Sequence, residues 1–256
     1  MGFIDHDVSM FVREKFKNAS DSPITLLPGG VYMTEKIAVI GGTGDLGFGL
    51  ALRWAKAGKH IIIGSRKEEK AKKTVEKMRT ILGKDVKVEG KVNYEAAAEA
   101  DIVVLSVPFF AQIGILKSIR DALEPGKILV DVIVPLATAI DGPPTKTLGV
   151  WTGSAAKLTE QLVPKGVKVV AAFKNVPADA VQNLDEDVDC DVIVCGDDEE
   201  AKRKVMKLAE LIPGVRAIDG GPLENAHVIE ELTAFLISIN IKYGVKNAGI
   251  RITGIK

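Results

Sequence analysis

The residues of this chain best suited to chemistry are a group of glycines that follows the apolar run 37–40. Gly42, Gly44 and Gly47 have the spacing G-x-G-x-x-G. In this arrangement the first glycine permits a tight turn after a strand, the second lets the backbone approach a pyrophosphate, and the third lets helix and strand pack closely. The helix expected from Phe48 would point its free N–H groups at the phosphates. The sequence therefore predicts a dinucleotide-binding loop, with a glycine turn that binds nothing as the alternative.

The end of the second expected strand indicates which dinucleotide binds. Sites for NAD usually place Asp or Glu there, about 20 residues after the glycines, to hold the ribose 2′-hydroxyl. This chain has Ser65 and Arg66 instead, and Lys70 four residues later. Ser65 can donate a hydrogen bond to a 2′-phosphate, Arg66 can hold it with two donors and stack on the adenine, and Lys70 can add a charge. These residues predict NADP; the alternative is that Arg66 and Lys70 are solvated helix charges.

The elements that position these residues alternate between strand and helix after residue 35. Strands are expected at 37–40, 61–63, 86–88, 102–107, 128–134, 167–173, 191–195 and 215–219. Helices are expected at 48–57, 67–82, 94–100, 111–123, 154–163, 197–211 and 223–242, and a loop at 135–153. Continuous apolar strands are typical of parallel strands covered on both faces. The pattern predicts an α/β fold, a doubly wound Rossmann-type parallel sheet with a smaller C-terminal α/β segment. Asp197 or Asp198 is the expected N-cap of helix 197–211.

The domain organisation follows from this pattern. Residues 35–153 are expected to form the NADP-binding domain, and residues 154–256 a smaller C-terminal domain that completes a cleft. Residues 1–34 are expected to be a flexible N-terminal extension, because the segment mixes charges, Ser, Pro and a Gly-Gly pair. Met33 precedes the first core strand closely, so we hypothesise that it is an authentic start.

Composition excludes several classes of function. Lys plus Arg and Asp plus Glu both total 34, so no field of one sign indicates nucleic acid or an acidic membrane. The spacing of Cys190 and Cys195 suits neither a redox pair nor a zinc site, and both are expected to be small core residues in a reducing cytosol. No apolar run approaches the ~20 residues that span a bilayer. We expect a cytoplasmic protein without a metal site.

From Lys36 to Ile252 the sequence resembles the archaeal NADPH-dependent coenzyme F420 reductases, also called F420H2:NADP oxidoreductases. The glycine loop 41–47 resembles the opening of that family, and Ser65-Arg66 with Lys70 resembles its 2′-phosphate clamp. Further matching segments follow in order: Leu105-Ser-Val-Pro108, Val134-Pro135-Leu136, Val176-Pro177-Ala178, Cys190–Asp198, Gly220–Leu223, Glu230–Thr233 and Gly249–Ile252.

The resemblance implies hydride exchange between NADP(H) and the 5-deazaflavin coenzyme F420. The implied cofactor contacts are Thr43, Gly44, Asp45, Leu46, Ser65, Arg66, Lys70, Phe109, Val134, Leu136, Val176 and Ala178. The deazaflavin is implied to lie in a cleft under the C-terminal segment. There the chain departs from the family, with Lys174 in place of a His and Ala248 in place of a Leu. Lys174 is the candidate contact to the deazaflavin, and a solvated lysine after a strand is the alternative.

The remaining side chains predict little acid–base chemistry. His6, His60 and His227 are scattered, with structural, surface or capping roles expected. Direct hydride transfer needs mainly orientation and exclusion of water, which agrees with this absence. Phe109 either stacks near the nicotinamide or lines the core. The apolar last helix predicts a homodimer. Two other functions stay open, an NADP-dependent imine or small-carbonyl reductase and a non-catalytic NADP-binding sensor.

Overall fold

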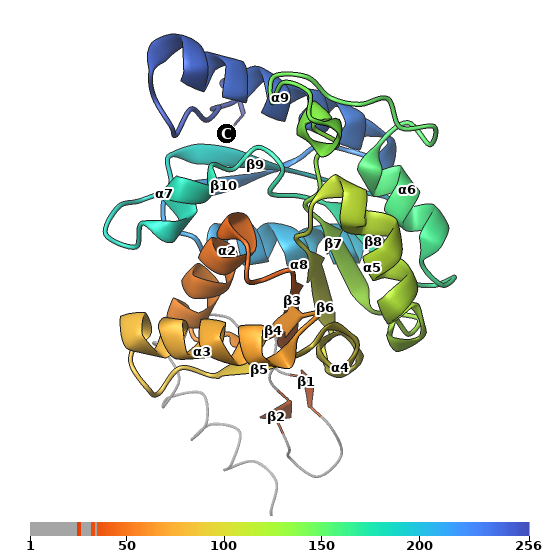
Figure 1. The fold of residues 1–256 in the computed structure, drawn as a ribbon, viewed down its shortest axis with the longest axis vertical. Helices are drawn as coiled ribbons and strands as arrows, with labels where there is room; N and C mark the ends of the chain where they lie inside the picture. Colours follow the sequence, from red (N-terminus) through yellow and green to blue (C-terminus); the bar gives the residue numbers. More distant parts are fainter. Residues whose placement is uncertain (1–24, 27–31, 34, 256) are drawn as a thin grey trace, which may run out of the picture. The chain divides into compact units, whose positions relative to one another are not determined.

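The computed structural model describes residues 25–26, 32–33 and 35–255 (Figure 1). The chain divides into two compact units, Met1–Thr34 and Glu35–Lys256. In the first unit, strands β1 (Thr25–Leu26) and β2 (Tyr32–Met33) pair antiparallel. The predicted flexibility of the N-terminal extension lies mostly outside the described residues. His6 also lies outside them.

The second unit is built on an eight-stranded sheet with the order β10-β9-β8-β7-β6-β3-β4-β5. Neighbouring strands are parallel except β8 and β9, which pair antiparallel. The strands are β3 (Lys36–Ile40), β4 (His60–Ser65), β5 (Val88–Val92), β6 (Ile102–Leu105), β7 (Ile128–Asp131), β8 (Lys168–Ala171), β9 (Cys190–Gly196) and β10 (Val215–Asp219). The predicted α/β doubly wound sheet is confirmed, with one antiparallel pair that the sequence did not indicate.

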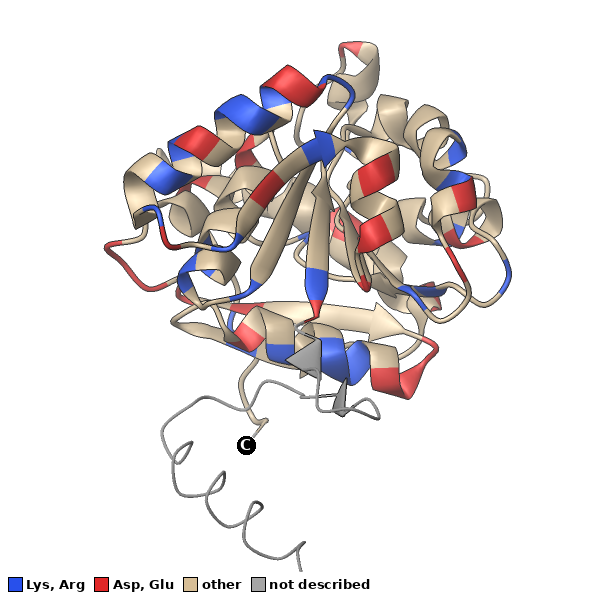
Figure 2. Ribbon diagram, turned by 90° about the horizontal axis from the view of Figure 1, so that it is seen from below, with Lys and Arg blue, Asp and Glu red and all other residues tan. Residues whose placement is uncertain are grey.

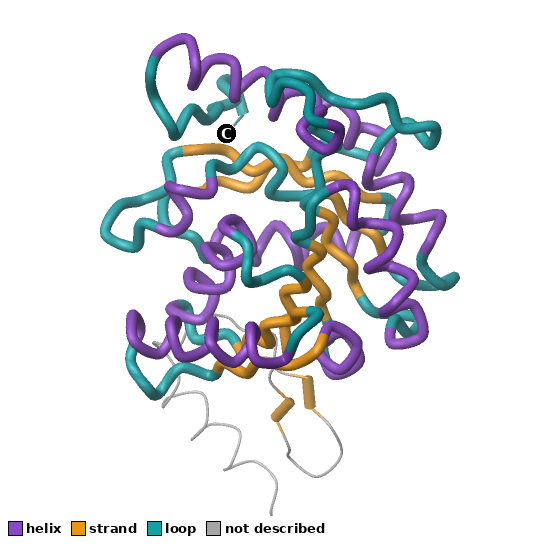
Figure 3. Tube along the Cα trace, in the orientation of Figure 1, coloured by secondary structure: helices purple, strands orange, loops and turns teal. Residues whose placement is uncertain are grey.

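Helices cover both faces of this sheet (Figures 1 and 3). They are α2 (Asp45–Lys56), α3 (Glu68–Leu82), α4 (Asn93–Glu99), α5 (Gln112–Ile119), α6 (Ala155–Leu162), α7 (Ala178–Gln182), α8 (Glu199–Glu210) and α9 (Ala226–Tyr243). Four short 3-10 helices join them: η1 (Phe109–Ala111), η2 (Arg120–Ala122), η3 (Ala137–Ile140) and η4 (Leu223–Asn225).

The core consists of two layers, one on each face of the sheet. In β3, Ile37 and Val39 pack with the cluster that includes α2, α3 and α8, whereas Ala38 and Ile40 pack with the cluster that includes α4 and α5. All four side chains are fully buried. Successive strand side chains point to opposite faces, so a strand covered on both sides must be apolar at every position. This is why the strands read as continuous apolar runs.

Charged residues of both signs are interspersed along the helices and loops around the sheet (Figure 2). Cys190 and Cys195 are buried and unpaired, which agrees with the prediction that they are core residues. Burial raises the pKa of each thiol to about 11. Within the described part of the chain, no helix is both long and apolar enough to cross a membrane.

Several predicted boundaries differ from the observed ones. Helix α2 begins at Asp45 rather than Phe48, because Gly44 already has extended N-cap geometry. Strands β6 and β7 end at Leu105 and Asp131, earlier than the predicted ends at 107 and 134. Helix α7 and η3 were not predicted, because both are very short. The predicted N-cap Asp198 of α8 is confirmed, and its Oδ1 accepts from the Ala201 N–H at 2.9 Å.

The predicted boundary near residue 153 does not divide the sheet. Strands β8, β9 and β10 continue the same sheet, and β8 pairs with β7 in parallel. Residues 35–256 form one compact unit by their contacts. The division at 153 stays a prediction about which half serves which substrate.

Candidate active site

The glycine loop lies between β3 and α2, and its backbone explains why glycines occur there. Gly41 has a left-handed φ of 82°, and a Cβ on it would lie 2.1 Å from the Ser106 carbonyl oxygen. The left-handed turn is therefore one residue earlier than the predicted position, Gly42. A Cβ on Gly42 would still lie only 2.9 Å from the Val39 carbonyl oxygen. Both positions exclude larger residues, which holds the loop close to the ends of β3 and β6.

The next two glycines of the motif have the predicted surroundings. A Cβ on Gly47 would lie 3.0 Å from the Gly41 oxygen and 3.1 Å from the Gly42 Cα, so a side chain there would push α2 away from the loop. Gly44 is open on its outer side, since the Gly41 oxygen at 3.5 Å is the only atom near its absent Cβ. Gly44 is also the N-cap of α2 and offers no side-chain cap. The first N–H groups of α2 are thus available for an anion.

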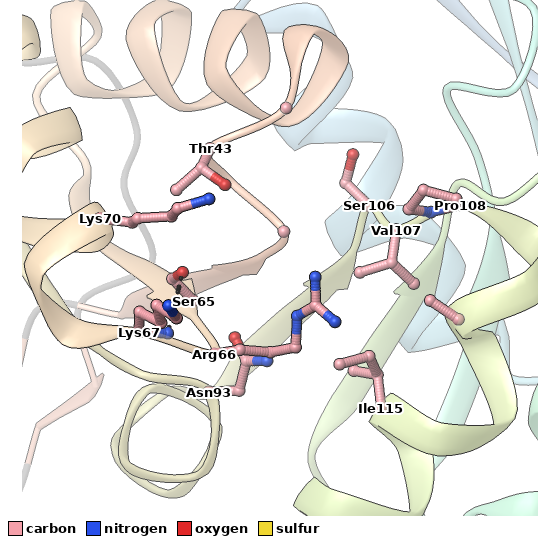
Figure 4. A pocket seen from close by; sticks show the side chains of 13 residues that line it. Thr43, Ser65, Arg66, Lys67, Lys70, Asn93, Ser106, Val107, Pro108 and Ile115 are labelled. Carbon is pink, nitrogen blue, oxygen red and sulfur yellow. Dashed lines mark hydrogen bonds between the residues drawn. The ribbon is translucent and has the colours of Figure 1, made fainter.

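A cavity of about 490 Å³, called the nucleotide pocket below, opens beside this loop (Figure 4). It lies where the strand order reverses between β3 and β6, the usual binding place in open α/β sheets. Its lining comes from four loops at the carboxyl ends of neighbouring strands: Gly41, Thr43, Gly44, Ser65, Arg66, Lys67, Lys70, Asn93, Ser106, Val107, Pro108, Ala111 and Ile115.

The predicted 2′-phosphate clamp lines this pocket. Ser65 ends β4, Lys70 lies in the first turn of α3, and the side chain of Arg66 extends toward Val107 and Ile115 (Figure 4). The Ser65 hydroxyl oxygen accepts from the Lys67 N–H at 3.3 Å, which leaves its own proton free to donate. Two positively charged side chains and one hydroxyl group thus line one cavity, and such hydrogen-bond donors are those that bind a phosphate.

A second cavity of about 410 Å³, called the C-terminal groove below, is lined by residues 174–179, by α9 and by residues 245–248. Of the predicted cofactor contacts, Lys174, Val176, Ala178 and Ala248 line it. Asp45, Leu46, Phe109, Val134 and Leu136 line neither of these two cavities. Phe109 is partly buried against the core, while its neighbour Phe110 is 74% exposed. The roles of these five residues stay predictions.

Lys174 does not point into the groove; its ammonium lies in a buried ion cluster. Nζ is 2.5 Å from Asp131 Oδ1 and 3.1 Å from Glu230 Oε1, and it donates to the Ile133 carbonyl oxygen. The side chain of Lys174 has no exposed surface, so the alternative of a solvated lysine is wrong. The residue is 3% exposed, and that surface is backbone. Direct contact between the ammonium and a deazaflavin stays a prediction that requires the cluster to open.

The cluster joins four elements around the ends of β7 and β8. Glu230 of α9 accepts from the backbone N–H groups of Ala155 and Ala156 in α6, and Asp131 accepts from the Thr159 hydroxyl at 2.6 Å. Burial raises the pKa of Glu230, Lys174 opposes this effect and Asp131 adds to it. Burial also lowers the pKa of Lys174, but the two carboxylates outweigh it and leave that pKa above its ordinary value.

Comparison with known proteins now identifies the family. The family "NADP oxidoreductase coenzyme F420-dependent" matches residues 36–135. The F420-dependent NADP reductase of Methanothermobacter thermautotrophicus is 49% identical over 225 residues, which are 87% of this chain and 97% of the relative. That of Methanocaldococcus jannaschii is 50% identical over 86% of this chain and 99% of the relative. The chain belongs to the F420-dependent NADP reductase family.

Solved structures agree with this family. A candidate F420-dependent NADP reductase from Arthrobacter sp. FB24 has a TM-score of 0.73 and 27% identity, covering 86% of this chain and 99% of that one. An imine reductase from Streptomyces aurantiacus has a TM-score of 0.56 and 18% identity, covering 81% of this chain and 62% of that one. The second likeness shows a shared fold alone.

In this F420-dependent NADP reductase family member, Asp191 fixes the C-terminal tail beside the groove. Its carboxylate is fully buried and accepts from Arg216 at 2.6 and 3.0 Å, from Arg251 at 2.9 Å and from the Ile252 N–H at 2.6 Å. The hydrogen bonds from Arg216 hold the pKa of Asp191 well below its usual range, against the effect of burial. The matching segment Gly249–Ile252 therefore has a physical role: it anchors the loop 245–248 that lines the groove.

The turn from β8 into the groove carries backbone strain. Phe173 has a left-handed φ of 58°, which costs about 1–2 kcal/mol for a residue with a Cβ. It is fully buried and packs edge-to-face on Trp54 at 5.5 Å. Arg53, next to that tryptophan, donates from its buried guanidinium to the carbonyl oxygens of Ala180, Val181, Asn183 and Glu186. These contacts hold α7, which begins at Ala178, against α2.

The sequence assigned no site role to several residues that the structure places at the site: Asn93, Ile115 and Asp131, and also Ser106, Asp191 and Glu230, which lie within segments that match the family. The two described histidines lie elsewhere: His60 contacts Glu89 at 2.6 Å, and His227 contacts the Glu224 carbonyl oxygen at 2.8 Å. These contacts agree with the structural and capping roles that were expected.

Proposed function

We propose that this chain catalyses hydride exchange between NADP(H) and coenzyme F420. The observation that carries the proposal is the 47–50% identity to three F420-dependent NADP reductases over nearly their whole length. When bound, the two coenzymes supply the chemistry, a hydride with its two electrons moving between nicotinamide C4 and deazaflavin C5. The protein supplies binding, orientation and exclusion of water.

The nucleotide pocket fits NADP by three independent features. Gly44 leaves the loop open for close approach of a phosphate, and the N-terminus of α2 lacks a side-chain cap. Ser65, Arg66 and Lys70 offer donors where a 2′-phosphate distinguishes NADP from NAD. We propose that the pyrophosphate lies on Thr43 and Gly44, and that the 2′-phosphate lies on the Ser65, Arg66 and Lys70 side chains.

We propose that the C-terminal groove receives the deazaflavin. Val176 and Ala178 follow Lys174 directly, so the buried ion cluster fixes the backbone that leads to them. The Thr233 hydroxyl of α9 lies 2.8 Å from the Lys174 carbonyl oxygen and ties the opposite wall of the groove to the same turn. In this proposal Lys174 is a positioning residue, because it holds the walls of the groove in place relative to the end of β7.

The direct test is to mix the protein with NADPH and oxidised F420 and to follow the deazaflavin absorbance. The proposal expects bleaching with NADPH and much slower bleaching with NADH. Binding of NADP without bleaching would contradict it. Turnover of a cyclic imine or small ketone would then favour a reductase of that kind, and binding without any turnover would favour an NADP sensor.

We also propose a homodimer that pairs the outer face of α9. Three large apolar side chains on one side of this helix, Val228, Phe235 and Tyr243, are 56–66% exposed. Exposed apolar surface of this kind marks protein interfaces. Light scattering on the purified chain should give twice the monomer mass, and Val228→Lys with Phe235→Glu should halve it. A cytoplasmic location is proposed as well, because both buried cysteines are free.

A further inference from the structure

A polar side chain that lines the nucleotide pocket has an oxygen without a hydrogen-bond partner among the described residues. Asn93 is the first residue of α4 and follows Val92, the register partner of Ser65. It is 7% exposed and lines the pocket beside Arg66 (Figure 4). Its carboxamide oxygen is buried and accepts no hydrogen bond from any residue that the structure describes. It also provides no side-chain cap for α4.

An unpaired buried carboxamide calls for an explanation. Buried polar side chains in native proteins nearly always have a partner, because an unmet hydrogen bond is costly. Packing and helix capping do not use this amide, so a ligand of the pocket is the remaining partner in a site built for one. The partner must offer a donor to the oxygen and an acceptor to the nitrogen.

The pocket around Asn93 has the lining chemistry that suits a planar base. The Arg66 side chain reaches across the pocket toward Val107 and Ile115 (Figure 4). Ala111 continues this apolar wall. A guanidinium on one face and aliphatic side chains on the other are well suited to a stacked heteroaromatic ring. Asn93 lines the pocket beside these groups, where a stacked ring would present its edge.

We propose that Asn93 reads the 6-amino edge of the adenine of NADP. Adenine offers its 6-amino donor next to the N7 acceptor, and this is the edge that a carboxamide pairs with through two hydrogen bonds, whereas hypoxanthine has two acceptors there, O6 and N7. The carboxamide turns about its Cβ–Cγ bond, a soft torsion, to bring its oxygen toward the base. The proposal rests on the nucleotide half of the proposed function and is independent of F420.

The test compares two nucleotides that differ only at this edge. Nicotinamide hypoxanthine dinucleotide phosphate carries a 6-oxo group in place of the 6-amino group of NADP. Dissociation constants of both reduced forms are measured through the fluorescence of the bound nicotinamide. The wild-type chain should bind NADPH about tenfold more tightly, a typical discrimination for one such base contact. Asn93→Ala should weaken NADPH binding and bring the two constants within about twofold.

Asn175 provides a matched control, because its carboxamide oxygen is also buried without a partner but it lines the C-terminal groove. Asn175→Ala should leave the ratio of the two constants unchanged. Asn93→Asp keeps an acceptor but removes the donor, and it should give an intermediate ratio. Thermal unfolding of each variant checks that it is folded, and Asn93→Ser replaces the alanine variant if that one is not.

Three results would overturn the proposal. In the first, the wild-type chain binds both nucleotides equally, which excludes the base contact whatever the variants do. Equal weakening of both nucleotides in Asn93→Ala would place the amide on the sugar or phosphate. Unchanged dissociation constants in Asn93→Ala would show that the amide does not contact the nucleotide. None of these measurements contains F420, so a failure to bleach F420 counts against the proposed reaction and leaves base recognition standing.

Discussion

The nucleotide pocket and the C-terminal groove place their charged residues in opposite ways. In the nucleotide pocket, Arg66 and Lys70 line the cavity directly. In the groove, the ammonium of Lys174 turns away from the cavity and is enclosed by Asp131 and Glu230. In our proposal the first region uses charge to bind a ligand, whereas the second uses charge to hold its own walls. A lysine near a cavity therefore does not by itself indicate contact with a ligand.

The two regions also differ in how they are assembled. The walls of the nucleotide pocket lie at the carboxyl ends of four neighbouring strands and at the starts of the helices that follow them, so the sheet fixes their positions. The groove depends on α9 and on a tail that strand pairing does not hold. The tail is held instead by the ion pairs of Asp191 with Arg216 and Arg251. We therefore expect substitutions around the groove to lower stability and F420 binding, and substitutions in the nucleotide pocket to lower NADP affinity.

The largest effect is expected from Lys174→Met. The substitution leaves two carboxylates buried without their cation, and breaking a buried ion pair in this way costs about 3–5 kcal/mol of unfolding free energy. Urea denaturation measures the loss. Lys246→Met is the control, because Lys246 lines the same groove but is exposed, and it should change stability by less than about 0.5 kcal/mol. Equal stability of the two variants would contradict the structural role of the cluster.

Arg66→Ala should have the next largest effect, and in the other region. Removal of a charge-assisted contact to a 2′-phosphate costs about 1.5–3 kcal/mol, so NADP should bind about 10–100-fold more weakly. NAD binding should weaken much less, because NAD lacks that phosphate and loses only the stacking contact between the guanidinium and the adenine. Arg79→Ala is the control in α3, the helix that follows Arg66, since Arg79 pairs with Glu76 and does not line the pocket. An equal loss of NAD and NADP affinity would contradict the clamp.

Asp191→Asn tests whether the groove depends on its distant anchor. Loss of the carboxylate weakens charge-assisted hydrogen bonds to Arg216 and Arg251, and we expect a loss of about 2 kcal/mol in unfolding free energy at pH 7. Steady-state kinetics should show a KM for F420 raised severalfold and an unchanged KM for NADPH. A change confined to NADPH would break the distinction between the two regions.

The pH dependence of stability sharpens the same test. The folded pKa of Asp191 is depressed, so its contribution is present above the unfolded value of about 3.9 and is lost as the pH falls through and below that value. The stability difference between the wild-type chain and Asp191→Asn should therefore shrink below about pH 4. Denaturant titrations between pH 3 and 7 measure it, and a difference that does not change with pH would remove the assigned ionic role.

The nucleotide pocket was predictable from the sequence because its signals are local. The glycines, the strand before them and Ser65-Arg66 each carry their meaning within a few residues. Asn93 was missed because β5 reads Val-Glu-Gly-Lys-Val, in which only Val88 is buried, and the expected strand was placed at 86–88. Without the correct end of that strand, a polar residue at the sheet edge gave no signal.

The groove was less predictable because its contacts join distant segments. The burial of Lys174 depends on Asp131 and Glu230, and the sequence alone does not show that β7, β8 and α9 meet. The C-terminal end of β7 was misplaced for a related reason: Val132 and Ile133 are buried and apolar, yet they lie beyond Asp131, the last residue of the strand. Apolar character predicts burial, whereas strand boundaries depend on backbone pairing.

The most direct test of the account follows the transferred hydrogen itself. NADPH carrying deuterium at C4, on each face in turn, is incubated with the protein and oxidised F420, and the reduced deazaflavin is analysed by mass spectrometry. Direct transfer predicts that deuterium from one of the two faces is retained in the reduced deazaflavin. Reduction of F420 with loss of the label to water from both faces, or no reduction at all, would contradict the account.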